Sequence, residues 1–463
     1  MSSVLSSPIN VMVFPKVVVA FSLTCMHQRG KISHAPLTVH FTLEVSSFHY
    51  IYSCDLYFLV FLQSSEYKAR DTCALTQLAE SARPQATRPE RHSLADTDDR
   101  PRGGQDQEIR ATSPLRFASN GAFKILQVAD MHFGNGDLTR CKDVAAPEFD
   151  FCSDLNTTRF VRRLIEAENP DFVAFTGDNI FGASSADAAE SLVKAFKPVM
   201  ESKIPWAAVL GNHDQESTMN RRELMHFISL MDYSVSQINP SPDSPSNADN
   251  NNVIRRIDGF GNYNLRVYGA AGSDLANTSI LNLFFLDSGD RATVGGIRTY
   301  DWIKESQLHW LRSITTEGSQ ANERGTDPDP ALTFFHIPVP EVRQLWLKDF
   351  VGQFQEGVAC SIVNSGVLDT LVSRGDVKAV FMGHDHNNDF CGQISGIWFC
   401  YGGGSGYHGY GKAGWQRRAR VILAELEKGK RAWMRVQRIK TWKRVDDENL
   451  SKFDEQILWH RSS

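Results

Sequence analysis

Five short apolar segments of this chain each end in polar residues of the kind that bind metal ions. The segments have the pattern of buried strands, and the clearest of them stops abruptly at Gly211, just before Asn212 and His213. Open α/β sheets bind their ligands beyond the carboxyl ends of such strands. The polar residues are therefore expected to converge at one edge of a sheet. The segments are Phe123–Ala129, Asp171–Thr176, Trp206–Leu210, Ala331–Phe335 and Asp376–Met382.

The polar residues after these segments form a recurring set of Asp, Asn and His. The motifs are Asp130-x-His132, Gly177-Asp178, Gly211-Asn212-His213, His336 and Gly383-His384-x-His386. Each motif alone has an ordinary structural explanation, because Asp and Asn favour turns and an isolated His is more often structural. Together they predict a metal centre, since mixed imidazole and carboxylate ligands suit Zn, Fe and Mn and no thiolate accompanies them. Without His213, these motifs supply seven candidate ligands. Seven ligands are too many for one ion, so the count predicts two ions that share a bridging carboxylate.

The segments between these strands predict an α/β fold. Strands interleaved with helices indicate two mixed β-sheets packed together, with helices outside. Later segments alternate like antiparallel strands, at Ile397–Tyr401, Arg420–Leu426 and Trp433–Ile439. The predicted helices are Thr157–Glu168, Ala186–Val199, Arg221–Leu230 and Trp302–Ile314.

The 463-residue chain divides into three parts by composition. Residues 1–112 are predicted as an N-terminal extension that is largely disordered or serves targeting, because its second half is rich in Arg, Asp, Gln, Pro and Gly. Residues 113–445 are predicted as the α/β domain, and residues 446–463 as a C-terminal tail. A net charge of -5 gives no reason to expect nucleic acid as a partner. No apolar run reaches the length that spans a bilayer.

Cysteine spacing and sequons favour the secretory pathway. Cys141 and Cys152 are close in sequence, as are Cys391 and Cys400, so each pair is a candidate disulfide. The chain also has Asn-X-Ser/Thr sequons that could carry glycans. The alternative is a cytoplasmic protein with reduced cysteines and chance sequons. The sequons begin at Asn156, Asn277 and Asn449.

The order of the motifs across residues 120–415 resembles the calcineurin-like metallophosphoesterase superfamily. The resemblance implies that His213 is the acid that protonates the leaving group, while a hydroxide bridging two divalent ions attacks a small phosphorylated substrate. The implied ligand sets are Asp130, His132 and His386 for one ion, Asn212, His336 and His384 for the other, and Asp178 as the bridge.

Within this superfamily, Phe285–Ser288, Trp302 and Gly402–Gly411 are most similar to the plant and fungal branch of purple acid phosphatases. Those enzymes bind ferric iron through a Tyr where this chain has Phe181, and they lack the imidazole of His132. Loss of the anionic phenolate favours divalent Mn, Zn or Fe(II) and predicts a colourless enzyme. The Gly-Asp-x-x-Asp-Arg-Gly motif of Ser/Thr protein phosphatases is absent.

These features predict a phosphatase of small phosphate monoesters. A phosphodiesterase or nucleotidase with the same centre is one alternative. A catalytically silent binding protein is another, since some members of the branch are labelled inactive, although none of the seven ligands is missing here.

Several further residues near the motifs have more than one explanation. Gly402–Gly409 could present backbone N–H groups to phosphate or form a turn between strands. His408 is a candidate substrate-side residue. Asp214 and Asp385 are expected to support the site rather than to bind metal. The cluster of Arg417, Arg418 and Arg420 is expected to be a solvated edge.

Overall fold

A computed structural model describes residues 114–240, 256–315 and 328–461, together with the backbone of short strands between residues 5 and 53. The chain divides into two compact units, Met1–Asp106 and Gln107–Ser463. The rest of the predicted extension at residues 1–112 lies outside the described residues, so its character stays a prediction. In the first unit, the described strands are β1 (Leu5–Ser6), which pairs with β4 (Thr24–Cys25), and the sheet of β2 (Val11–Phe14), β3 (Val17–Ala20), β5 (His40–Val45) and β6 (Phe48–Ser53).

The second unit contains a six-stranded mixed sheet in the order β21-β20-β19-β7-β8-β9. Its parallel strands β7, β8 and β9 have long buried stretches, which explains why they appear in the sequence as apolar runs rather than as alternating patterns. The strands are β7 (Ala122–Val128), β8 (Phe172–Thr176), β9 (Trp206–Val209), β19 (Arg418–Lys428), β20 (Trp433–Val445) and β21 (Lys452–His460).

A seven-stranded mixed sheet has the order β10-β11-β14-β16-β18-β17-β15. Its four central strands, β11, β14, β16 and β18, are parallel to one another. The strands are β10 (Tyr263–Tyr268), β11 (Ser279–Phe285), β14 (Ala331–Phe334), β15 (Phe350–Val351), β16 (Val377–Met382), β17 (Cys391–Ile394) and β18 (Ile397–Tyr401).

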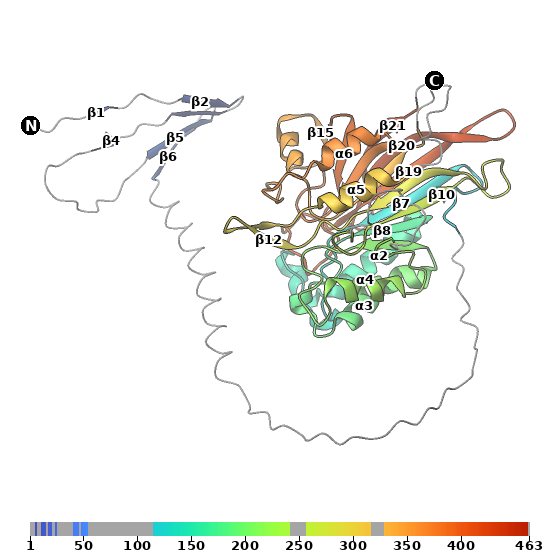
Figure 1. The fold of residues 1–463 in the computed structure, drawn as a ribbon. Helices are drawn as coiled ribbons and strands as arrows, with labels where there is room; N and C mark the ends of the chain where they lie inside the picture. Colours follow the sequence, from blue (N-terminus) through green and yellow to red (C-terminus); the bar gives the residue numbers. More distant parts are fainter. Residues whose placement is uncertain are drawn as a thin grey trace, which may run out of the picture. The chain divides into compact units, whose positions relative to one another are not determined.

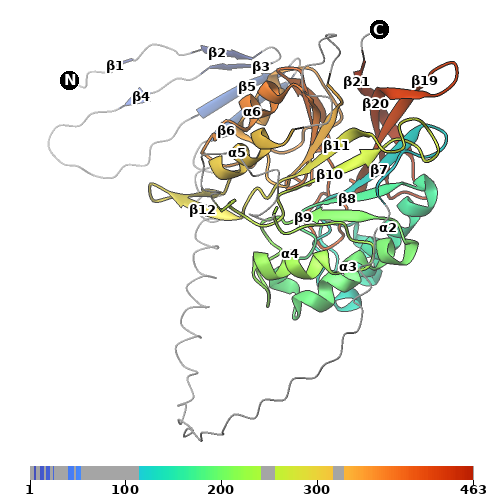
Figure 2. The same cartoon turned by 45° about the vertical axis from the view of Figure 1, so that its right-hand side comes forward.

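Helices flank the two sheets (Figures 1 and 2). Helices α2, α3 and α4 lie on the side of the six-stranded sheet, and α5 and α6 lie on the side of the seven-stranded sheet. The predicted fold class, two packed mixed sheets with helices outside, is confirmed. The helices are α2 (Asp154–Glu168), α3 (Ala188–Ser202), α4 (Arg221–Ser229), α5 (Glu305–Ser313) and α6 (Val367–Arg374), with 3-10 turns η1 (Gly136–Leu138), η2 (Ala146–Phe151), η3 (Gly182–Ser184) and η5 (Pro340–Leu347).

The central core is built from aromatic and aliphatic side chains of both sheets. Tyr263, Phe285, Phe334 and Phe381 form a stacked row across β10, β11, β14 and β16, with neighbouring ring centroids 4.9 to 5.4 Å apart. Large buried rings contribute most of the apolar area that stabilises a core. This row fixes the strands whose ends carry the candidate ligands.

The arginine cluster is buried, so the prediction of a solvated edge is wrong. Arg418 and Arg420 lie on β19, which has β20 on one side and β7 on the other. Arg418 Nη1 is 2.5 Å from Asp389 Oδ2, and Lys443 Nζ is 2.7 Å from Asp389 Oδ1. Arg420 Nη2 donates to the Asp389 carbonyl at 2.7 Å, and Arg417 donates to backbone carbonyls. Burial of these cations is tolerated because each has acceptors.

The C-terminal residues extend the six-stranded sheet. Residues 446–463, predicted as a tail, include β21, which pairs antiparallel with β20 from Arg438↔His460 to Arg444↔Lys452. The sheet therefore continues past the predicted boundary at residue 445. The predicted strand Trp433–Ile439 likewise extends to Val445, because β20 pairs with β19 on one side and with β21 on the other along this stretch.

One two-stranded hairpin belongs to neither sheet. Strands β12 (Arg291–Val294) and β13 (Ile297–Tyr300) pair with each other and project from the body of the domain in both ribbon views (Figures 1 and 2). Gly295 and Gly296 form its tip with positive φ angles of 56° and 82°, as a tight hairpin turn requires. The base of the hairpin lies beside the strand ends that carry the candidate ligands.

The candidate disulfides are both present. Cys141 is bonded to Cys152, and Cys391 is bonded to Cys400, with which it is also paired directly across β17 and β18. Cys360 is a buried free thiol.

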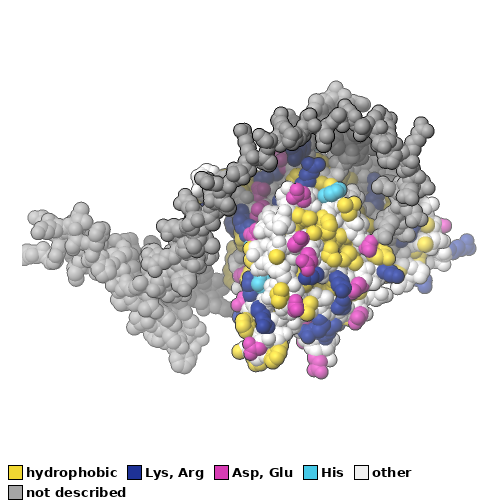
Figure 3. Space-filling view, turned by 90° about the horizontal axis from the view of Figure 1, so that it is seen from below, with side chains coloured by type: hydrophobic (Ala, Val, Ile, Leu, Met, Phe, Trp, Pro, Cys, Tyr) yellow, Lys and Arg dark blue, Asp and Glu magenta, His cyan; other side chains and the backbone are white. Residues whose placement is uncertain are grey.

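The face that Figure 3 displays, on the side of α3 and α4, carries acidic and basic side chains interspersed. Among the described helices, none combines the length and the apolar character needed to cross a bilayer.

Candidate metal centre

The candidate ligands lie beyond the carboxyl ends of parallel strands from both sheets. Asp130, Asp178 and Asn212 follow β7, β8 and β9 of one sheet, whereas His336 and His384 follow β14 and β16 of the other. All of these side chains are at most 6% exposed, which excludes ordinary surface roles. The sequence prediction rested on polar residues that directly follow strands. The structure places these residues, from both sheets, at one site.

The Asp and His side chains form a cluster able to hold two metal ions. Ligand atoms of Asp130, His132, Asp178 and His386 all lie within 4.8 Å of one another. Ligand atoms of Asp178, His336 and His384 form a second such group, so Asp178 belongs to both. Asn212 lies beside the second group, with its Oδ1 3.3 Å from His336 Nε2. The assignment of each residue to a particular ion stays a prediction.

The backbone around the cluster adopts conformations that L-residues rarely occupy. Asp130, His132, Asp178 and His384 have φ angles of 55°, 46°, 48° and 81°. Left-handed residues other than glycine cost roughly 1–2 kcal/mol each, and such strain concentrates at functional sites. Hydrogen bonds between strand ends hold these turns: His132 N donates to the Asp178 carbonyl at 2.8 Å, and His384 N donates to Asp130 Oδ1 at 2.9 Å.

Two glycines allow close approach around the cluster. A Cβ atom at Gly211 would collide with the Asp178 carboxylate. A Cβ atom at Gly406 would collide with the Met131 carbonyl, in the turn between two candidate ligands. Any larger residue at either position would push the turns apart.

The donor set fits two bridged ions. His132 Nε2 is buried without a hydrogen-bond partner among the described residues, and it lies 3.3 Å from Asp178 Oδ2. His336 Nε2 lies 3.2 Å from the same oxygen. A buried imidazole nitrogen without a partner costs free energy unless something binds it. Imidazoles from two groups that approach one carboxylate form a suitable donor set for a pair of borderline divalent metals.

Burial is the largest influence on the pKa of each imidazole in the cluster. It lowers the pKa of His132 and holds those of His384 and His386 well below the ordinary value, so these rings are neutral and keep a lone pair. At His336, burial is outweighed by the combined effect of attraction to Asp178 and Asp130 and of hydrogen bonds to Asp178 and the Thr176 carbonyl, which raises the pKa to about 9. The imidazoles of His336 and His132 hold the pKa of Asp178 well below its usual range, against the effect of burial.

His213 lies at the cluster but has a different environment from the candidate ligands. Its side chain is 24% exposed, and its backbone N–H donates to Asp178 Oδ1 at 2.8 Å. The ring Nδ1 is 2.8 Å from Glu216 Oε2. Arg291 lies against the ring with Nη2 3.4 Å from both ring nitrogens, and its Nη1 donates to the Asn212 carbonyl at 2.7 Å. The arrangement suits a ring that is held for proton transfer rather than for metal binding.

Sequence reasoning missed Glu216, Arg291 and two tyrosines at the site. A pocket of about 70 Å³ lies at the cluster and includes Tyr300 and Tyr410 in its lining. The Tyr300 ring is 4.4 Å from that of His384, and the Tyr410 ring stacks on His386 at 3.9 Å. Only Glu216 had a local signal, because it stands three residues after His213. Arg291 and Tyr300 come from the hairpin of β12 and β13, and Tyr410 comes from the loop after β18.

The carboxylates expected to support the site have structural partners. Asp214 accepts hydrogen bonds from the backbone N–H groups of Gly211 and Ile180, at 2.7 and 3.0 Å. Asp385 accepts from the Tyr401 hydroxyl at 2.7 Å. Burial raises the pKa of Asp214 to about 6 and that of Asp385 to about 7. Neither belongs to the two ligand groups.

Several backbone N–H groups of the glycine-rich loop form hydrogen bonds within the fold and are therefore not free to bind phosphate. Backbone N–H groups of Gly404, Ser405 and Gly406 donate to the carbonyls of residues 386, 129 and 130. His408 uses both ring nitrogens, with Nδ1 2.7 Å from the Arg140 carbonyl and Nε2 3.0 Å from Ser184 Oγ. These contacts favour the explanation of a structural turn over that of a phosphate cradle, and they leave His408 without a ring nitrogen for substrate.

Comparison with known proteins identifies the family. The family model described as calcineurin-like phosphoesterase matches residues 123–388. The chain is 64% identical over 349 residues to the Arabidopsis thaliana protein named Probable inactive purple acid phosphatase 28, covering 75% of this chain and 87% of that protein. It is 51% identical over 355 residues to Probable inactive purple acid phosphatase 29 of the same plant, covering 75% and 89%.

A fungal relative is more distant. The Saccharomyces cerevisiae protein named Phosphatase DCR2 is 35% identical over 359 residues, which cover 74% of this chain and 57% of that protein. The matched residues 123–388 extend from β7 to the loop after β16 and so contain every candidate ligand. The chain belongs to the calcineurin-like phosphoesterase family, among its purple acid phosphatase-like members.

Proposed function

We propose that this chain is a dimetal phosphatase that hydrolyses phosphate monoesters. The observation that carries the proposal is the pair of buried ligand groups that share Asp178 beside the partly exposed His213. The proposed ligands of one ion are Asp130, His132 and His386, and those of the other are Asn212, His336 and His384, with Asp178 between them.

Two divalent ions bound there would polarise the phosphoryl group and activate the attacking water. The chain supplies the rest of the chemistry. Its buried Asp and His side chains line a pocket of about 70 Å³, and their burial strengthens electrostatic interactions. His213 would donate a proton to the departing alkoxide.

The contacts of His213 support its role as the acid. Because Glu216 occupies Nδ1, the ring keeps a fixed orientation and Nε2 is the nitrogen that can face a leaving group. Arg291 Nη1 lies 3.0 Å from Glu216 Oε1 and so holds the carboxylate in place. The three side chains form a connected unit, of which His213 lines the pocket.

The names of the relatives disagree on whether such proteins are active. Two plant relatives are named probably inactive, whereas the yeast relative is named a phosphatase. Absence of turnover would be expected if a ligand were replaced by a residue without a donor atom. All seven proposed ligand positions of this chain carry donors, which supports activity.

The deciding experiment is metal reconstitution of the purified full-length chain. Protein stripped with chelator is loaded with Mn, Zn or Fe(II) and assayed on phenyl phosphate, p-nitrophenyl phosphate and bis-p-nitrophenyl phosphate. The proposal expects about two metals per chain and faster hydrolysis of the monoesters. Faster hydrolysis of the diester would instead establish a phosphodiesterase. Two bound metals without hydrolysis of any ester would establish a binding protein.

The disulfides support a location in the secretory pathway. Cys141–Cys152 and Cys391–Cys400 are both formed, as expected of an oxidising compartment. Mass mapping of native protein should find both bridges. Free thiols at these four positions would place the protein in a reducing compartment.

A further inference from the structure

Lys142 contacts the ring of Phe181, which also contacts the proposed leaving-group acid, and no carboxylate in the described part of the chain forms an ion pair with this lysine. We propose that it binds a second anionic group on the substrate, so that the preferred substrates are phosphate monoesters whose leaving group carries a carboxylate or another phosphate. This inference rests on the proposed function, since it names the substrate class of that same site. It makes Lys142 a specificity-determining residue outside the metal centre.

The position of Lys142 is defined by the Phe181 ring. Lys142 Nζ lies 4.4 Å from the centroid of this ring. The same ring is 4.8 Å from the His213 ring and 5.5 Å from the His132 ring. Phe181 therefore contacts the proposed acid, one proposed ligand and the lysine. In the proposed complex, a substituent of the leaving group would extend along Phe181 to the ammonium group.

The charge of Lys142 is not matched by the protein. Among the described residues, no carboxylate forms an ion pair with its ammonium group, and Asp143 and Asp154 are the acids that influence its pKa. Asp143 accepts from Gly411 N at 3.0 Å, and Asp154 accepts from Gly134 N at 2.7 Å, so both carboxylates are engaged elsewhere. Desolvation lowers the pKa of Lys142, as expected for a partly buried ammonium group that lacks a close anion.

Arg291, a cation that contacts His213, differs from Lys142 because it has ion-pair partners. Arg291 Nη1 lies 3.0 Å from Glu216 Oε1 and 3.1 Å from Asp290 Oδ1. Its charge is already balanced, so Arg291 is suited to hold the acid in place. Lys142 is the cation that an incoming anion can neutralise without breaking an existing pair.

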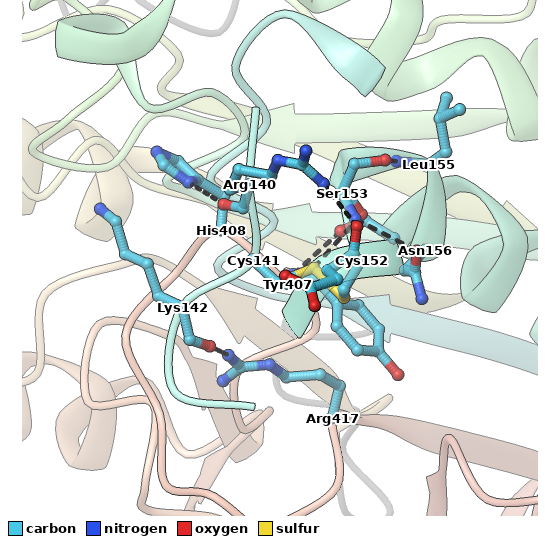
Figure 4. The surroundings of a disulfide bond; sticks show 12 residues. Arg140, Cys141, Lys142, Cys152, Ser153, Leu155, Asn156, Tyr407, His408 and Arg417 are labelled. Atoms are coloured by element: carbon cyan, nitrogen blue, oxygen red, sulfur yellow. Dashed lines mark hydrogen bonds between the residues drawn. A yellow bond between two sulfur atoms is a disulfide. The ribbon is translucent and has the colours of Figure 1, made fainter. Parts of the chain in front are cut away.

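The segment that carries Lys142 is fixed to the domain, as Figure 4 shows. The disulfide of Cys141 with Cys152 fixes the residue before Lys142 and closes the loop that contains this lysine. Lys142 N donates to the Tyr407 carbonyl at 2.8 Å, and Arg417 Nη2 donates to the Lys142 carbonyl at 2.8 Å. In this view the side chain of Lys142 extends away from the disulfide, on the side of the His408 ring. A fixed backbone lowers the entropy cost of presenting the ammonium group to a ligand.

The test compares pairs of substrates in which one member carries an additional anionic group. 4-Carboxyphenyl phosphate and its neutral carboxamide analogue, 4-carbamoylphenyl phosphate, have the same shape. Propane-1,3-diol bisphosphate and monophosphate form a second pair for an additional phosphate. The full-length, metal-loaded chain should show a higher kcat/KM for the charged member of at least one pair. Equal values for both members of both pairs would overturn the proposal.

Substitution of the lysine assigns the preference. Lys142→Gln should lower the preference for the charged substrate roughly tenfold, because one charge-assisted contact is lost, and should leave the neutral substrate unchanged. Lys142→Arg should keep the preference. Lys197→Gln, which removes an exposed cation of α3 that is paired with Glu201, is the control for net charge. An equal loss on both substrates in Lys142→Gln would contradict the proposal.

Binding measurements separate this inference from the proposed function. Calorimetry compares 4-carboxyphenylphosphonate with 4-carbamoylphenylphosphonate, neither of which can be hydrolysed. Tighter binding of the charged phosphonate, lost in Lys142→Gln, supports the inference even when the chain hydrolyses no ester. Turnover without any charge preference supports the proposed function and refutes the inference. A Cys141→Ser, Cys152→Ser double variant should lose part of the preference, and full retention would refute the role of the disulfide.

Discussion

Glu216 and His213 form a carboxylate–imidazole pair at the wall of the metal centre, with Glu216 Oε2 2.8 Å from His213 Nδ1. They are three residues apart in a turn that follows β9, so the pair is set by local geometry. Arg291, from the projecting hairpin, contacts both members. The proposed acid is thus oriented by side chains that are not themselves candidate ligands.

Glu216→Ala should weaken proton donation without removing metals. The ring of His213 would lose its fixed orientation, and we expect a loss of roughly 10-fold to 100-fold on phenyl phosphate, as for other residues that orient imidazoles. The loss should be smaller on p-nitrophenyl phosphate, whose leaving group needs no proton. Glu190→Ala, which removes an exposed carboxylate of α3, is the matched control. A uniform loss on both esters would mean that Glu216 is only structural.

His213→Ala tests the acid itself. The variant should retain both metals, since His213 belongs to neither ligand group, and should lose roughly 10²–10⁴ in rate on poor leaving groups. Elemental analysis and the same two esters provide the measurement. Loss of metal from this variant would instead indicate that His213 is a ligand.

Asp178→Asn tests the bridge. Asp178 is shared by both ligand groups, and its negative charge offsets repulsion between two neighbouring cations. We expect metal content and turnover to fall together, with circular dichroism unchanged. Asp369→Asn removes an exposed carboxylate of α6 and should change neither quantity. Two metals and normal rates in Asp178→Asn would refute the assignment.

Phe181 predicts a colourless protein. A benzene ring supplies no oxygen donor, so iron-loaded wild type should lack the visible band of a phenolate bound to ferric iron. Phe181→Tyr should acquire such a band, because the ring at this position lies 5.5 Å from that of His132. The visible absorbance spectra of the iron-loaded wild type and of Phe181→Tyr, compared directly, test this prediction. A coloured wild-type protein would show that another anionic ligand is present.

Glu168 predicts a pH-dependent contribution to stability. Burial opposes its charge, but hydrogen bonds from Trp442 and Arg444, at 2.9 and 2.6 Å, lower its pKa below the ordinary value. A lowered folded-state pKa stabilises the fold above the unfolded pKa of about 4.3, and that stability is lost as pH falls through the folded value. Glu168→Gln should therefore cost about 1 kcal/mol at pH 7 and progressively less below pH ~4.

Urea unfolding at pH 7 and at acidic pH measures the effect of Glu168→Gln. Glu166→Gln, on the exposed face of the same helix, should unfold like the wild type at every pH. A difference between Glu168→Gln and wild type that stays constant with pH would mean that the carboxylate charge contributes nothing.

The sequence predicted the parts of the site that depend on strand ends. Asp130, Asp178 and Asn212 follow apolar runs, and parallel strands place such residues at one edge regardless of the loops between them. Local pattern also predicted most helices, with ends displaced by a few residues. Boundaries shifted where caps decide them: α2 begins at Asp154 because Ser153 accepts from Leu155 N.

The remaining parts depend on tertiary placement. Arg291 and Tyr300 reach the site on a hairpin that has no motif, and Lys142 reaches the Phe181 ring from a disulfide-bonded loop. Arg420 appeared to belong to an exposed basic cluster because charge predicts exposure. In the structure, Arg420 is buried because β19 lies between β7 and β20 and because the Asp389 carbonyl accepts a hydrogen bond from its guanidinium group. No pattern within β19 itself predicts these neighbours.

The division of the ligands between two sheets has a consequence for fragments of this protein. A chain cut between residues 240 and 256 would leave Asp130, Asp178 and Asn212 on one piece and His336 and His384 on the other. Strands β19, β20 and β21 from the second piece also complete the six-stranded sheet of the first. Neither piece alone could assemble both ligand groups, so metal uptake would serve as a direct readout of complementation between the two halves.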